Sequence, residues 1–168
     1  MNRSTERGFT LVEIMIVVAI IALLAAIAIP NVLRGRTSAN ESAAVGNIRA
    51  LVSSLEMYRS VNNSYPDAFR GDMYTAATPD FGPPSFDLDI QTGAQTVQGY
   101  NYRFTPTGTE PNVTQYTLTA TPQTALRTGT RSFFVDETGT IRHCVVVNQG
   151  DLATVADATI DGAPTNPC

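Results

Sequence analysis

Lysine is absent from the 168 residues, so all eleven basic side chains are arginines. A phosphate-binding P-loop and a Schiff-base enzyme both need a lysine, so the chain belongs to neither class. Charge is also sparse, since charged residues make up 15% of the chain and the net charge is −4, with a pI of about 4.8. This balance argues against a nucleic-acid partner, because proteins that bind nucleic acids normally present a basic face.

Cysteine and histidine are scarce as well. The two cysteines are Cys144 and the last residue, Cys168. A pair that ties down the chain end favours a disulfide, which requires an oxidising compartment outside the cytoplasm; two free buried thiols are the alternative. His143 precedes Cys144 in an expected strand, where adjacent side chains point to opposite faces. We therefore expect no catalytic Cys–His pair.

Acidic loops raise the question of a calcium site. The candidate ligands are Asp87, Asp89, Asp151, Asp157 and Asp161. Their spacing does not follow that of an ordered calcium loop, so solvated loop carboxylates are the simpler interpretation. The sequence therefore predicts no metal, no cofactor and no enzymatic constellation.

A long apolar segment near the N-terminus dominates the sequence. From Phe9 to Ile29, only Thr10 and Glu13 are not apolar. As a helix, at about 1.5 Å per residue, this segment is roughly 30 Å long and matches the hydrocarbon core of a membrane. A secretory signal peptide would be cut after its apolar run, but no small-x-small cleavage site follows this one. We therefore expect one membrane-spanning helix.

A helical pattern resumes after Pro30, which ends the apolar run. Apolar residues then recur at steps of four and three, on one helix face: Ala44, Ile48, Leu51, Leu55 and Tyr58. The segment from Asn62 to Pro66, NNSYP, is a helix stop signal. The sequence thus predicts one helix over residues 9–61, apolar all round in its first half and amphipathic in its second.

Strands are expected in the C-terminal part, after an irregular connection over residues 63–96. Tyr100, Tyr102 and Phe104 alternate with polar residues, and a hairpin signal follows near Gly139. We predict three or four antiparallel strands whose apolar face is covered by the amphipathic half of the helix. The expected fold class is therefore α+β.

The segment from Gly8 to Met15, GFTLVEIM, resembles the processing motif of type IV prepilins and of the pseudopilins of type II secretion systems. The resemblance continues through Pro30 and, more loosely, to Pro66. It implies a pilin fold made of a leader (1–8), a transmembrane and assembly helix (9–30), an amphipathic helix half (31–62) and a β head with a C-terminal disulfide loop (63–168).

The resemblance also implies roles for single residues. Gly8 is expected to be the last leader residue, read by a membrane prepilin peptidase, and Phe9 the new N-terminus, methylated by the same enzyme. Glu13 is expected to pair with the amine of Phe9 on a neighbouring subunit, and Pro30 to mark a bend in the assembled helix.

Physical chemistry supports the pairing of Glu13 independently. A carboxylate at mid-bilayer costs at least ~2.5 kcal/mol, so such a residue is expected to have a function and a partner. The apolar segment contains no cation, whereas cleavage after Gly8 would create an amine. The alternative is that Glu13 lies near the headgroups and is hydrated.

Two functions follow from the resemblance. The first is a structural subunit of a type IV pilus, assembled into a homo-oligomeric extracellular fibre for adhesion or twitching motility. The alternative is a pseudopilin, forming a periplasmic fibre of a type II secretion system. In either case, the subunit is expected to be a single-pass, N-in protein of the bacterial inner membrane before assembly and to bind an assembly platform there.

Overall fold

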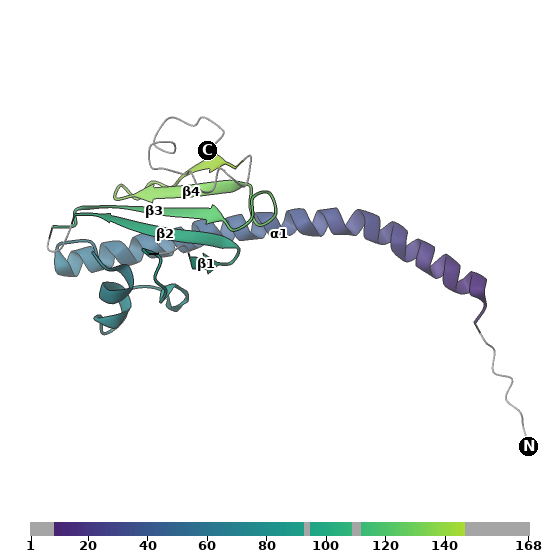
Figure 1. Ribbon diagram of the computed structural model, residues 1–168, viewed down its shortest axis with the longest axis horizontal. Helices are drawn as coiled ribbons and strands as arrows, with labels where there is room; N and C mark the ends of the chain where they lie inside the picture. The colour runs from purple at the N-terminus through teal and green to yellow at the C-terminus, as the bar shows by residue number, and fades with distance from the viewer. Residues whose placement is uncertain (1–8, 93–94, 109–111, 147–168) are drawn as a thin grey trace, which may run out of the picture. The chain divides into compact units, whose positions relative to one another are not determined.

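A computed structural model describes residues 9–92, 95–108 and 112–146 (Figure 1). A long helix, α1 (Leu11–Asn62), is followed by a π-helical turn (Gly71–Thr75) and a 3-10 turn (Pro84–Phe86). The strands are β1 (Gln95–Val97), β2 (Tyr100–Thr107), β3 (Gln115–Pro122), β4 (Arg131–Asp136) and β5 (Arg142–Val145). They form one antiparallel sheet in the order β1-β2-β3-β4-β5. The predicted α+β fold class is confirmed.

The chain forms two compact units, with the division between Gly35 and Arg36. In the N-terminal unit, every described residue is exposed except Ala25, which is half-buried. The most apolar 18-residue window of α1 has a mean hydropathy of 3.0, so the helix is long and apolar enough to cross a membrane. Pro30 lies inside α1 and does not end it.

The second unit, which begins at Arg36 and is called the head from here on, has its own hydrophobic core, shared by the amphipathic part of α1 and the inward face of the sheet. The helix stripe predicted from the sequence is buried, from Ala44 at 0% exposure to Tyr58 at 6%. Opposite it, the alternating side chains Tyr102, Phe104 and Leu118 are 0% exposed. Helical periodicity on one side and period-two alternation on the other therefore predicted the two surfaces that meet.

One strand was missing from the prediction. Strand β1 has three residues, too few for a period-two pattern to be recognised, and is joined to β2 by Gln98 and Gly99. Both residues have positive φ angles, 51° and 79°. This combination suits the tight two-residue turns of β-hairpins, whose twist matches that of the flanking strands.

The end of α1 agrees with the predicted stop signal. Asn63 follows the last helical residue with φ 56°, and its backbone N–H donates to the carbonyl of Arg59 at 2.8 Å. Asparagine tolerates this left-handed conformation, which closes the helix. Just beyond, the Tyr65 hydroxyl donates to Glu56 and accepts from Arg59. Burial, together with the bond to Glu56, raises the pKa of Tyr65 to about 12.

The connection after α1 contributes to the core. Its aromatic and aliphatic side chains Tyr65, Phe69, Met73, Phe86 and Ile90 are all 0% exposed. Phe69 packs against Phe104 of β2 with ring centroids 5.2 Å apart. The irregular segment predicted here is therefore a packed part of the head.

Two core tyrosines allow a matched test of how much a buried hydroxyl group contributes to stability when it has a hydrogen-bond partner. The Tyr100 hydroxyl donates to the carbonyl of Arg131 at 2.8 Å, whereas the buried Tyr116 hydroxyl has no hydrogen-bond partner among the described residues. Tyr100→Phe should therefore destabilise the head by about 1 kcal/mol, while Tyr116→Phe should be neutral or stabilising. Urea unfolding of both variants measures the difference. Equal losses would show that Tyr116 has a partner, such as an ordered water.

Candidate assembly site

Glu13 lies in the first turn of α1 and closes a reciprocal cap with Thr10. The backbone N–H and the hydroxyl of Thr10 both donate to Oε2 of Glu13, at 2.8 and 2.9 Å. In return, the backbone N–H of Glu13 donates to Oγ1 of Thr10 at 3.2 Å. Because Thr10 immediately precedes the helix, this arrangement is a capping box, which satisfies two backbone donors of the helix terminus.

Sequence reasoning missed this cap, although its signal was present. A Thr followed three residues later by a Glu, just before an apolar run, is the sequence signature of a capping box. The cap gives Glu13 a local role in the isolated subunit, beside the positive end of the helix dipole. The ion pairs found among the described residues involve other carboxylates. The predicted pairing of Glu13 with an amine on another copy stays a prediction.

The two processing residues lie at the edge of the described chain. Gly8 falls outside the described residues, and Phe9 is 85% exposed. From Phe9 to Leu33, the large apolar side chains are between 51% and 85% exposed. Such a surface is far larger than a soluble monomer tolerates, so it must face lipid or other protein chains.

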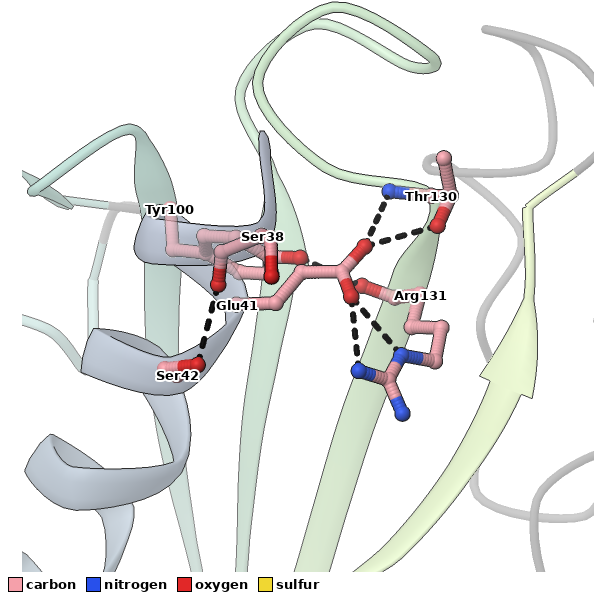
Figure 2. A network of polar contacts seen from close by, with 6 residues as sticks. All are labelled: Ser38, Glu41, Ser42, Tyr100, Thr130 and Arg131. Carbon is pink, nitrogen blue, oxygen red and sulfur yellow. Dashed lines mark hydrogen bonds and ion pairs between the residues drawn. The ribbon is translucent and has the colours of Figure 1, made fainter. Parts of the chain in front are cut away.

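In the head, Glu41 anchors α1 to the start of β4 (Figure 2). One carboxylate oxygen accepts from the backbone N–H and the hydroxyl of Thr130, both at 2.7 Å. The other accepts from Nε and Nη2 of Arg131, at 2.8 and 2.7 Å. The Glu41 residue is only 6% exposed, while the Arg131 side chain remains 43% exposed.

The electrostatics of Glu41 are set by two opposing effects. Burial alone would raise the pKa of Glu41, but the hydrogen bonds from Thr130 and the hydrogen bonds and charge of Arg131 outweigh it, so the pKa is lowered. Next to it on the helix, the Asn40 amide donates to the carbonyl of Thr128 at 2.9 Å. Together these contacts fasten the helix to the β3–β4 connection, a link that sequence analysis did not find.

Other candidate residues are distributed over the head. Cys144 lies on β5 at 5% exposure, and the predicted partner Cys168 lies outside the described residues, so the disulfide stays a prediction. His143 is exposed beside it, as strand alternation requires. Asp87 pairs with Arg70 at 2.8 Å, and Asp89 accepts from the backbone N–H groups of a local turn. Asp151, Asp157 and Asp161 lie beyond the described part of the chain.

Comparison with known proteins adds to this geometry. The family described as the prokaryotic N-terminal methylation motif matches residues 3–29. Type II secretion system core protein G of Klebsiella michiganensis is 41% identical over 71 residues, which cover 42% of this chain and 50% of that protein. The type IV wide pilus major component PilA4 of Thermus thermophilus is 49% identical over 59 residues, covering 35% of this chain and 45% of that protein.

The chain spans about half the length of the curated relatives that it matches. No solved structure matches it at a comparable level of significance. The methylation motif and the relatives nevertheless confirm the resemblance to pilins and pseudopilins. The long apolar helix and the five-stranded antiparallel sheet make a pilin-like fold. Motif, relatives and fold are therefore all similar to those of pilins and pseudopilins, and α1 is apolar enough to anchor the chain in a membrane.

Proposed function

We propose that this chain is a structural, non-enzymatic subunit of a helical fibre. A prepilin peptidase removes residues 1–8 and methylates the new N-terminus, Phe9. The observation that carries the proposal is the combination of a prepilin-type motif with an apolar helix whose side chains are exposed from Phe9 to Leu33.

The division of the chain into two units is suited to a subunit that moves from a membrane into a fibre. The head has its own core and can leave the membrane surface without refolding. The apolar helix, by contrast, needs an apolar environment, which lipid supplies first and the helices of other subunits supply later. Because lipid already satisfies apolar side chains, packing and the Glu13 pair have to provide the specificity of assembly.

A type IV pilus is the first assignment, with an extracellular fibre that serves adhesion or twitching motility. It is supported by the 49% identity to the Thermus wide-pilus component. The predicted disulfide, which needs an oxidising compartment, is compatible with it.

A pseudopilus of a type II secretion system is the second assignment. It is supported by the matches to core protein G of Klebsiella michiganensis, Aeromonas hydrophila and Pseudomonas aeruginosa, at 38–41% identity. Each of these matches covers 42% of this chain and half of the relative, as the match to the pilus component covers 35% and 45%, so the coverage does not favour one machine over the other. In both cases, the subunit in the inner membrane binds an assembly platform.

Fibre formation and its dependence on processing test the proposal together. Cells that express the wild-type chain should display fibres that react with an antibody to the head in electron microscopy. Gly8→Leu should leave a heavier, unprocessed chain in the inner membrane and no fibres, because the peptidase site is blocked. Surface fibres support the pilus, and head-reactive fibres confined to the periplasm support the pseudopilus. Fibres from the uncleaved Gly8→Leu chain would contradict the processing step.

A further inference from the structure

A groove of about 600 Å³ lies on the head between the end of α1 and residues 72–81. Its floor is formed by Tyr58 and Phe81, whose rings meet edge to face at 5.2 Å. Met57 and Val61 project from α1 along one wall, and they are 52% and 65% exposed. These are the only large apolar side chains of α1 beyond Leu33 that are exposed.

The rim of the groove is acidic. Asp72 and Asp80 line it, and the neighbouring wall consists of uncharged residues, from Ala76 to Pro79. Asp80 is exposed. A ligand for this groove would therefore combine aliphatic side chains with a positive charge.

The chain itself carries a surface with that chemistry. Ile29, Leu33 and Arg36 follow one another at steps of four and three along α1, so they share one face of the helix. Ile29 and Leu33 are 59% and 56% exposed, and Arg36 is exposed too. Arg34 is two residues from Arg36 and so points to the opposite side of the helix.

We propose that the acidic-rimmed groove binds the Ile29–Leu33–Arg36 face of a second copy of this chain. The aliphatic side chains fill the space beside Met57 and Val61, and the guanidinium of Arg36 lies against Asp80. The contact joins two different surfaces, so it is heterologous, and repetition of such a contact builds an open helical filament. The inference rests on the proposed fibre function and names a surface through which subunits meet.

Cysteine cross-linking in the fibre tests the contact directly. Fibres of the Leu33→Cys, Val61→Cys variant should give a ladder of covalent multimers on a non-reducing gel after mild oxidation. The Arg34→Cys, Val61→Cys variant is the matched control and should give at most the wild-type background from Cys144 and Cys168. Intact fibres without a ladder in the first variant would overturn the inference. So would a cross-link from Val61→Cys that joins only a different protein.

A charge swap provides the second arm. Arg36→Asp and Asp80→Arg should each lower the yield of sheared fibres about fivefold, and the double variant should recover to within about twofold of wild type. Arg34→Asp changes the charge equally on the other side of the helix and should reduce the yield less than about twofold. Equal losses of fibre yield for Arg34→Asp and Arg36→Asp, with no recovery in the double variant, would contradict the proposed contact. Absence of fibres from wild-type cells would instead overturn the proposed function, and the contact with it.

Discussion

Glu13→Gln should reduce assembled fibres about a hundredfold or more while leaving cleavage after Gly8 intact. The reason is the loss of charge. In the proposed fibre, removal of the leader would place the amine of Phe9 in the apolar core, where it would need an anion that a neutral amide cannot provide. Burying that amine unpaired is unfavourable enough to stop assembly.

The capping box makes this experiment sharper than a simple truncation. Glutamine is accepted at this position of a capping box, so Glu13→Gln keeps an acceptor for the backbone N–H of Thr10. Thr10→Ala is the complementary change, because it weakens the cap and keeps the carboxylate. It should lower the fibre yield only about fivefold, the scale of a lost N-cap.

The measurement is an immunoblot of sheared fibres against total cell-associated chain, with leader removal followed by gel mobility. Wild-type yield from Glu13→Gln would refute the pairing role. A loss from Thr10→Ala as severe as that from Glu13→Gln would show instead that Glu13 acts through the helix cap.

Glu41→Ala should lower the melting temperature of the head by roughly 10 °C, from a loss of about 2–3 kcal/mol. The variant deprives the part-buried backbone N–H of Thr130 of its acceptor and leaves Arg131 without the carboxylate oxygen to which its Nε and Nη2 both bond. The loss falls below that of a fully buried pair, because the Arg131 side chain is 43% exposed and can be hydrated.

Thermal unfolding of the full chain in detergent micelles, followed by the near-ultraviolet signal of the core tyrosines, measures this effect. Arg49→Ala is the control, because Arg49 is exposed on the same helix; it should shift the midpoint by less than about 2 °C. A shift from Glu41→Ala no larger than that of the control would mean that the contacts in Figure 2 contribute little to stability.

The pH dependence of Glu41 provides an independent check on the same contacts. Because the folded-state pKa lies below the ordinary value of 4.5, the contribution of Glu41 is present at neutral pH and is lost as the pH falls through the lowered value. The difference in stability between wild type and Glu41→Gln should therefore be constant from neutral pH down to about 5 and narrow below 4.5. A difference that widens on acidification would contradict the direction of the pKa shift.

Periodicity explains which parts of the fold were predictable. The helix stripe that includes Ile48 and Leu51, and the alternation that includes Tyr102 and Phe104, are local patterns that any stable packing must respect. Strand β1 was not predicted because three residues are too few to show a period-two alternation. The turn at Gly99 was the better indication of this strand. The cap between Thr10 and Glu13 was also local and could have been found from its spacing.

Long-range contacts could not be predicted in this way. Glu41 and Arg131 are 90 positions apart, and nothing in the neighbourhood of either residue indicates the other. The groove beside Val61 likewise needs residues 72–81 to fold back beside the end of α1. Both depend on where the chain returns in space.

The sequence by itself determined that this chain has a segment resembling the prepilin motif and a helix that is apolar before Pro30 and amphipathic after it, because both features follow from residue type and spacing. Only the tertiary structure decided that Glu41 fastens this helix to β4 and that Asp80 lines a groove beside Val61. Burial, hydrogen-bond geometry and the proximity of distant segments arise when the core closes, so they are properties of the packed chain.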